Sequence, residues 1–339
     1  MQALSEAQFR AATDGGVPDP EPIAEGLWSV PVPMPGDLLD YTLSVVHLGP
    51  DGAVTVVDPG WETPEVHDRL ETALASLGRR VADIRHIVVT HAHPDHVGAA
   101  DALRRATGAR LLMHEREQAG LERLRAGLTP DAPSTVAGWG APDEALDRLE
   151  QGIARVSEGV VLPDPADVLL RDGEPLPIPG FECEVVLTPG HTEGHICLVD
   201  RGRALVFSGD HVLPNLFPGV GLGIGADPSA ENPVAAYLAS LDRMAPFDDL
   251  DVVPGHGYRF RGLASRRREM ADHILARAGE VAAALASDPA ASTWQMASQL
   301  TWSAGWERLS QGPMAASALR QTDLYADFVR AGGLDGAAA

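Results

Sequence analysis

The clearest element in the hydrophobic pattern is a short run in the first third of the chain. Residues Ile84 to Val89 are mostly apolar and β-branched, which is typical of a buried strand. An alanine-rich segment with helical spacing, Pro94 to Thr107, follows after a brief polar stretch. A strand that ends in polar side chains just before a helix places those side chains at the carboxyl edge of a sheet.

Alternating segments on both sides of this run predict further elements. Tyr41 to Leu48 and Ala53 to Val57 read as strands joined by an Asp-Gly hairpin turn, and Pro64 to Leu77 reads as a helix. The proline-rich stretch from Trp28 to Leu39 predicts a loop, either a plain connection or one in which Met34, Leu38 and Leu39 line a substrate pocket. The other expected strands are 110–114, 167–170, 181–187, 196–200 and 204–208, and the other expected helices are 115–126 and 142–158.

Two strand-rich halves with helices between them predict two sheets packed face to face, with helices on both outer sides. This is an α/β fold of the αββα sandwich type, to which a C-terminal helical extension is added. Residues 1–26 are rich in proline, glycine and acid and predict a surface segment. We therefore expect a catalytic domain over residues 27–260 and a helical region over residues 261–339. The proline- and glycine-rich insertion at 128–141 suggests no chemistry.

The C-terminal region carries three expected helices: Leu263 to Ala286, Pro289 to Leu300 and Pro313 to Val329. Three tryptophans fall close together here, and such a cluster favours a small core or an interface over a ligand site. They are Trp294, Trp302 and Trp306. This region is also a candidate for contacts in a homo-oligomer.

Composition narrows the class of protein. The chain has 339 residues, of which 45% are hydrophobic, and no apolar run approaches the ~20 residues of a membrane span. The first 20 residues lack a basic start and an apolar core, so we expect no export signal and a cytoplasmic protein. Cys183 and Cys197 cannot form a disulfide framework and are expected to be buried thiols in neighbouring strands.

The net charge and the basic residues of the chain argue against lysine chemistry and against nucleic acid as a partner. The formal net charge is −22 and the sequence contains no lysine, so a lysine nucleophile or Schiff base is ruled out. Strong acidity argues against binding to nucleic acid, because phosphate contacts depend on basic side chains. A small-molecule substrate is the expected partner.

The polar stretch after the central strand has the spacing of a metal site. His91 and His93 are two positions apart in extended chain, so both imidazoles leave the same side and can converge on one ion. Asp95 and His96 follow a proline suited to the first helical position, and can face a second ion nearby. The alternative is a solvated loop with capping residues, which this dense pattern makes the poorer interpretation.

Three later segments place similar side chains beside glycine directly after a strand. They are Thr188 to His195, Phe207 to His211 and Val252 to Gly257. Glycine lets the backbone approach a site closely. Asp58, at the end of the second hairpin strand, is either a turn residue or an outer carboxylate that orients a metal-bound histidine.

In order and spacing these motifs resemble the metallo-β-lactamase-fold superfamily, and within it the glyoxalase II-like hydrolases, over about residues 27 to 260. The resemblance implies that His91, His93 and His191 bind a first metal and that Asp95, His96 and His256 bind a second. It further implies that Asp210 bridges the two metals and that Asp58 is the outer aspartate. The C-terminal stretch resembles, more weakly, a winged-helix-like appendage of the same superfamily.

Asp210 also bears on the reaction, because the resemblance implies a bridging aspartate in hydrolases of thioesters, lactones and phosphodiesters rather than in zinc β-lactamases. Two divalent ions can share a water and lower its pKa toward about 7, giving a hydroxide that attacks a carbonyl. The sequence thus predicts a dinuclear hydrolase of a small acyl substrate, a thioester or related ester. Alternatives are a phosphodiesterase, ribonuclease or lactonase, a non-heme iron dioxygenase, or a regulator that acts through the C-terminal helices.

Roles remain to be assigned to the metal, the catalytic residues and the basic cluster. Zinc is the expected metal, with iron and manganese as alternatives. Asp95, Asp210 and His195 are the expected catalytic residues, and His211 is a second candidate for a pocket role.

His114, alone at a strand end, favours a structural role. Arg266 and Arg267, in the only basic cluster, are either paired with nearby acids or hold an anionic group of the substrate.

Overall fold

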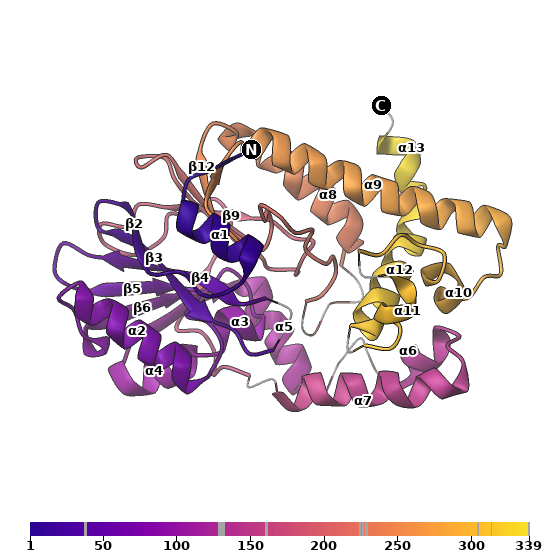
Figure 1. The fold of residues 1–339 in the computed structure, drawn as a ribbon, viewed down its shortest axis with the longest axis horizontal. Coiled ribbons are helices and arrows are strands. Elements are labelled where there is room, and N and C mark those ends of the chain that lie inside the picture. The colour runs from indigo at the N-terminus through magenta and orange to yellow at the C-terminus, as the bar shows by residue number, and fades with distance from the viewer. Residues whose placement is uncertain are drawn as a thin grey trace.

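The computed structural model describes residues 1–36, 39–127, 133–159, 162–223, 225, 227, 230–303, 305–312 and 314–337. Within these residues the strands form two sheets that face each other, with helices on the outer sides (Figure 1). The expected αββα sandwich is therefore confirmed. No helix among the described residues combines the length and the apolar character that a membrane span requires.

The first sheet contains the strand that precedes the candidate ligands His91 and His93. Among the described residues its order is β2-β3-β4-β5-β6-β7-β8, antiparallel up to β5 and parallel from β5 to β8. Because β5, β6 and β7 run in parallel, their carboxyl ends meet at one edge. The strands are β2 (Glu21–Ala24), β3 (Leu27–Pro33), β4 (Tyr41–Leu48), β5 (Val54–Val57), β6 (Ile84–Val88), β7 (Arg110–His114) and β8 (Val168–Leu170).

The second sheet brings the later motifs to the same end of the sandwich. Its order, within the described part of the chain, is β1-β13-β12-β11-β10-β9, and β11 runs parallel to β12. The residues that follow these two strands therefore emerge side by side. The strands are β1 (Gln2–Ala3), β9 (Glu184–Leu187), β10 (Ile196–Asp200), β11 (Leu205–Gly209), β12 (Asp251–Pro254) and β13 (Phe260–Arg261).

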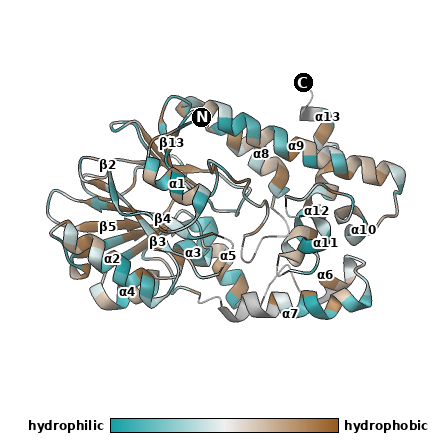
Figure 2. Ribbon diagram, in the orientation of Figure 1, coloured by the Kyte–Doolittle hydropathy of each residue, from teal (hydrophilic) through white to brown (hydrophobic). Residues whose placement is uncertain are grey.

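Helices cover the outer faces of both sheets. On the first sheet lie α2 (Pro64–Ser76) and α4 (Ala100–Thr107), and on the second lie α8 (Pro233–Arg243), α9 (Leu263–Ser287) and α12 (Ala315–Arg330). The inter-sheet core is apolar, with Val88 and Phe207 fully or almost fully buried. In Figure 2 strands such as β5 consist mainly of hydrophobic residues, whereas helix α9 is a mixture of hydrophilic and hydrophobic residues.

The remaining helices lie near the N-terminus, around the metal motif and in the helical region. They are α1 (Glu6–Asp14), α3 (Pro94–Val97), α5 (Glu115–Arg125), α6 (Pro133–Gly138), α7 (Asp143–Gly159), α10 (Thr293–Ala297), α11 (Trp306–Leu309) and α13 (Gly333–Ala337), with short 3-10 turns at Val81–Asp83 and Ala245–Phe247. The single helix expected from Pro94 to Thr107 is thus broken into α3 and α4 around Gly98.

Residues 1–26 lie mostly at the surface, as expected, but the fold does not begin after them, because they contribute strands to both sheets. β1 pairs with β13 and β2 pairs with β3. Gln8 is fully buried, donates from Nε2 to Ser29 Oγ at 3.0 Å and accepts from the Arg259 amide at 3.0 Å. A two-residue strand is too short to leave a periodic signal in the sequence.

The loop expected from Trp28 to Leu39 is wrong over its first part, since β3 pairs with β4 along its whole length. Its prolines are accommodated because β2 pairs with β3 only as far as Ser29, so Pro31 and Pro33 lie beside an open edge. A proline in a strand needs such an edge, because it has no amide proton to donate to a neighbour. Leu38, one of the expected pocket residues, lies outside the described residues.

The C-terminal region is helical, as expected, but it is not separate from the sandwich. Met270 and Ile274 of α9 share one core with β10 to β12 and α8. A second small core joins the α6–α7 insertion to α10 and α12, and the three tryptophans pack around it, as the sequence predicts. Among the described residues from 263 to 337 the elements are helices only, so the strands of a winged helix are not found there.

Candidate metal centre

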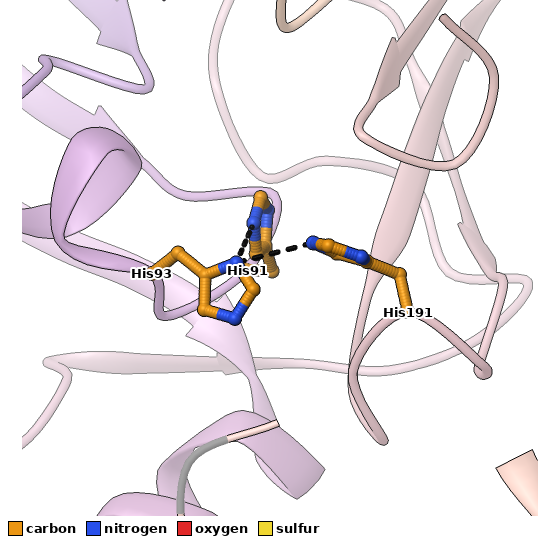
Figure 3. A group of neighbouring side chains, drawn as sticks. All are labelled: His91, His93 and His191. Atoms are coloured by element: carbon orange, nitrogen blue, oxygen red, sulfur yellow. Dashed lines mark hydrogen bonds between the residues drawn. The ribbon is translucent and has the colours of Figure 1, made fainter. Parts of the chain in front are cut away.

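Three histidines converge at the carboxyl edge of the sheets. His91 and His93 lie in the loop after β6, and His191 lies in the loop between β9 and β10. His93 Nδ1 is 3.0 Å from His91 Nε2 and 3.1 Å from His191 Nε2, and Figure 3 shows the three rings turned toward one another. We call this group the first cluster. It joins loops from both sheets.

A second cluster lies beside the first. His96 and Asp95 come from α3, and His256 follows β12 of the other sheet. His256 Nε2 lies 3.2 Å from His96 Nε2 and 3.0 Å from Asp95 Oδ2. All three side chains offer a ligand atom within 4.8 Å of the others. Both clusters thus combine residues that are distant in sequence.

Asp210, which follows β11, stands between the two clusters. Its Oδ2 lies 3.8 Å from His191 Nε2 in the first cluster. Its Oδ1 lies 3.4 Å from His96 Nε2 and 3.5 Å from His256 Nε2 in the second. The side chain is buried, and Oδ1 has no hydrogen-bond partner among the described residues. A carboxylate in this position can serve both clusters.

The outer ring nitrogens of the histidines fix the direction of the inner lone pairs. His93 Nε2 donates to the Leu222 carbonyl at 2.8 Å and His191 Nδ1 donates to the Gly219 carbonyl at 2.7 Å. In the second cluster His256 Nδ1 donates to the Tyr41 carbonyl at 2.9 Å. A histidine that donates from one nitrogen presents the other as an acceptor, which is the arrangement found at metal sites.

The carboxylate of Asp58 plays the same part for His96 that the backbone carbonyls play for the other histidines. Its Oδ2 accepts from His96 Nδ1 at 2.9 Å and from Thr90 Oγ1 at 2.7 Å, and its Oδ1 accepts from the Thr90 amide at 2.7 Å. The residue adopts a φ of 51°, which aspartate tolerates better than most side chains. This geometry matches the outer carboxylate expected from the sequence.

Burial and neighbouring charges act differently on the two clusters. Burial, reinforced by His93, lowers the pKa of His191 to about 4. Burial also opposes charge on His256, but Asp210 and Asp95 outweigh it and raise the pKa of His256 to about 10. The pKa of Asp210, which burial alone would raise, is held well below its usual value by His256 and His96. The second cluster therefore carries the carboxylate charge that a cation would neutralise.

These donors fit a divalent metal. In the first cluster three imidazole nitrogens face one another, with His93 Nδ1 about 3 Å from the other two, an approach that is repulsive unless a proton or a metal cation lies between them. The unpartnered Asp210 Oδ1 in the second cluster is a buried acceptor that lacks a donor among the described residues, which is unusual in a folded protein. Imidazole and carboxylate are the ligand types that zinc, iron and manganese accept.

His195 does not have the surroundings of the catalytic residue expected from the sequence. The Asp210 amide donates to His195 Nε2 at 3.1 Å, so His195 Nδ1 carries the ring proton and donates to Thr188 Oγ1 at 2.8 Å. Both nitrogens are thus occupied inside the protein. His195 fixes the backbone of Asp210 and has no proton free for a substrate.

His211 and His114, the two other histidines for which the sequence suggests a role outside the clusters, have different surroundings. His211 is buried and its ring packs against Tyr237. His114 caps α5, since its Nδ1 accepts from the Arg116 amide at 3.2 Å. The structural role expected for His114 matches this contact.

Glu117 of α5 is a buried carboxylate that the sequence patterns do not single out. It accepts from the Ala92 amide at 2.9 Å, from the Gly194 amide at 2.8 Å and from Thr192 Oγ1 at 2.5 Å. These partners lie in the two loops that carry the first cluster, so Glu117 ties the loops together. Nothing near Glu117 in the sequence signals this, because the loops are 25 and about 75 residues away.

The expected anion site at Arg266 and Arg267 is not favoured by their contacts. Arg266 is buried and donates to the carbonyls of Leu213 and Leu216, at 2.7 and 2.5 Å. Arg267 forms a two-point ion pair with Asp248 at 2.7 and 2.8 Å. Both guanidinium groups are therefore engaged within the protein, and the paired alternative is the better interpretation.

Two cavities flank the ligand loops. One of about 310 Å³ is lined by Leu39, Tyr41 and Gly257 on the His256 side, so Leu39 does line a pocket while Met34 is not among the lining residues. The other, of about 420 Å³, is lined by Gly190, Thr192 and Leu324 on the His191 side. Their lining residues neighbour His256 and His191 along the chain but include none of the candidate metal ligands.

Comparison with known proteins agrees with this architecture. Residues 40–256 match the family described as Metallo-beta-lactamase superfamily. The chain is 28% identical over 205 residues to a hydroxyacylglutathione hydrolase of Haemophilus influenzae, covering 60% of this chain and 79% of that protein. It is 26% identical over 238 residues to a probable metallo-hydrolase of Bacillus subtilis, covering 69% of this chain and 72% of that protein.

Among solved structures, the chain is similar to a metallo-beta-lactamase family protein from Thermus thermophilus. The sequence identity is 29% and the TM-score is 0.73. The match covers 92% of this chain and 95% of the other, so the similarity extends into the C-terminal helices.

Proposed function

Because this chain belongs to the metallo-beta-lactamase superfamily and is a metal-dependent hydrolase, we propose that its two clusters would hold a pair of divalent ions and that the protein hydrolyses a small acyl substrate. His91, His93 and His191 hold the first ion, and zinc is the proposed metal. Asp95, His96 and His256 hold the second. When bound, the ions supply an acidified water as nucleophile and a positive charge for the carbonyl oxygen.

The observation that carries this proposal is the position of Asp210. Its two oxygens face different clusters, one 3.8 Å from His191 Nε2 and the other 3.4 Å from His96 Nε2. This carboxylate would contribute one oxygen to each of the two ion sites. Asp95 and Asp210 provide the negative charge that offsets the charge of the ions, and Asp58 and His195 orient the groups that touch them.

The surroundings of the clusters favour a thioester. A thiolate leaves readily because its conjugate acid has a pKa near about 8.5, whereas an alkoxide or amine usually needs a proton donor. His195, the histidine nearest to such a role, has both nitrogens occupied. The relative from Haemophilus influenzae is named for hydrolysis of hydroxyacylglutathiones, which are thioesters.

The test compares substrates and metal states. Metal-depleted protein is reconstituted with zinc and assayed on an acyl thioester, an alkyl ester, a lactone and a chromogenic phosphodiester. We expect about two equivalents of zinc and the largest kcat/KM for the thioester. The double variant His93→Ala, Asp210→Ala should lose both the metal and the activity.

His67→Ala is the matched control, because it removes a partly exposed histidine of α2 that belongs to neither cluster. It should behave like the unmodified protein. Full turnover by the double variant would overturn the mechanism. Hydrolysis of the phosphodiester in preference to every acyl substrate would overturn the assignment of the substrate class.

A further inference from the structure

A short loop, residues 219–222, supplies the outer contacts of the first cluster. The Gly219 carbonyl accepts from His191 Nδ1 at 2.7 Å, and the Leu222 carbonyl accepts from His93 Nε2 at 2.8 Å. The loop also bonds back to the His191 loop, since the Gly221 amide donates to Gly190 O at 2.7 Å and the Leu222 amide donates to His191 O at 2.9 Å. Its position therefore sets the direction of two of the three histidines.

The C-terminal helix α12 holds this loop in place. Gln321 Oε1 accepts from the Val220 amide at 3.1 Å, and Arg320 Nε donates to the Gly221 carbonyl at 2.7 Å. A Cβ at Gly221 would lie 2.2 Å from Leu324 Cδ1, so loop and helix meet closely at a glycine with a φ of 70°. These contacts join residues about 100 positions apart. We call them the α12 clamp.

Helix α12 is itself firmly anchored. Leu319 and Ala318 are buried, and Leu319 packs into the small core shared with the α6–α7 insertion. On another face Tyr325 and Phe328 pack into the core shared with α8 and α9. Asn232, which caps α8, donates from Nδ2 to the Leu324 carbonyl at 3.0 Å. The clamp thus connects the first cluster to the whole helical region.

The second cluster has no comparable link among the described residues. Its outer contacts are Asp58, at the end of β5, and the carbonyl of Tyr41, at the start of β4. Both belong to the sandwich. The two clusters therefore differ in what holds them: the helical region supports one and the sheets support the other.

We infer that α12 is a positioning element of the first metal site, and that Gln321 and Arg320 act on the affinity of this site and not on that of the second. This inference rests on the proposed metal centre. It assigns a role to the C-terminal region beyond packing: the helices set how tightly the first ion is held. Removing a direct outer partner of a metal-bound histidine changes metal affinity by about 10- to 100-fold, and the α12 clamp holds the loop that carries two such partners.

The experiment measures zinc affinity, not activity, in two single-site proteins. His256→Ala leaves the first cluster intact, and His191→Ala leaves the second. Zinc is titrated into each metal-depleted protein against a chelator of known affinity. Adding Gln321→Ala should weaken zinc binding about 10-fold or more in the His256→Ala protein. In the His191→Ala protein it should change the affinity by less than about twofold.

Two controls separate positioning from general damage. Gln321→Glu keeps an oxygen that can accept from the Val220 amide, and should restore the affinity of the first cluster. Arg330→Ala removes an exposed charge at the end of α12 and should leave both affinities unchanged. Thermal unfolding of the zinc-free proteins checks that each variant folds.

Each other outcome counts against the inference. Unchanged zinc affinity in both single-site proteins, or an equal loss in both, would overturn the role of α12 while leaving the metal centre standing. Absence of zinc binding in both single-site proteins before Gln321 is changed would overturn the proposed metal centre, and the clamp with it.

Discussion

His96 and His256 bring their Nε2 atoms to within 3.2 Å of each other across 160 positions of sequence. Their outer nitrogens donate to Asp58 and to the Tyr41 carbonyl, so both rings are held with a nitrogen facing the same point. Two such nitrogens approach this closely only when a proton or a cation lies between them. The carboxylates of Asp95 and Asp210 around that point favour a cation of higher charge.

Asp58→Asn should weaken the second metal site. An amide in place of the carboxylate presents a donor to Thr90 or to His96 Nδ1, both of which already donate, so His96 loses its fixed orientation. We expect about a 10- to 100-fold loss of zinc affinity at the second cluster, measured by titration against a chelator. Asp51→Asn, in the exposed hairpin turn, is the control. An unchanged zinc content at limiting zinc would contradict the role of Asp58.

His195→Ala should reduce kcat for every acyl substrate by a similar factor, about 10-fold or more. The reason is that His195 accepts from the Asp210 amide and holds that backbone, without donating a proton to the leaving group. The measurement compares a thioester with an alkyl ester of the same acyl group. A loss confined to the alkyl ester would identify His195 as a general acid, which is the opposite result.

Arg266→Ala should destabilise the protein and leave substrate binding unchanged. The variant leaves the buried Leu213 carbonyl and the partly buried Leu216 carbonyl without their donor, which costs about 3 kcal/mol of unfolding free energy. Arg267→Ala breaks a partly exposed ion pair with Asp248 and should cost about 1 kcal/mol or less. Denaturant unfolding gives these values. A raised KM for anionic thioesters, with normal stability, would restore the anion-site interpretation.

The unfolding free energy should fall in acid, and His114 should account for part of the loss. Burial lowers the pKa of His114 to about 4, and its Nδ1 must stay unprotonated to accept from the Arg116 amide. The unfolded chain takes up this proton near about pH 6.5, so stability is lost as the pH falls from about 6.5 toward 4.

The measurement compares unfolding of the wild type and His114→Asn in a chelator at pH 7 and pH 5. Asparagine caps a helix without titrating. We expect the variant to lose about 2 kcal/mol less than the wild type over this range. Equal losses would show that His114 has the same pKa in both states of the chain.

Local patterns were sufficient to predict the sandwich and the residues at its edge. The apolar run that forms β6 and the strand Arg110–His114 are where the sequence predicts them, and the ligand candidates follow strand ends that the pattern marks. Asp210 and His256 lie side by side because β11 and β12 are parallel neighbours, and the residues after β6 meet them from the facing sheet.

The parts that local patterns missed depend on distant partners. β1 has two residues and can be recognised as a strand only from its pairing with β13. The prolines of β3 suggest a loop until the open edge beside them is known. Glu117 and Gln321 each act on loops far away in the chain, and no spacing rule connects them to a histidine.

Each cluster takes its side chains from both sheets: the residues after β6 come from one and His191 and His256 come from the other. An ion bound in either cluster would connect the two sheets, whose strands come from largely separate parts of the sequence. The second cluster can form only after the ribosome has released His256, so an ion can bind there only late in the synthesis of the chain. Removal of the metal should therefore weaken the contact between the two sheets as well as abolish catalysis, and a lower unfolding temperature of the metal-depleted protein would show it.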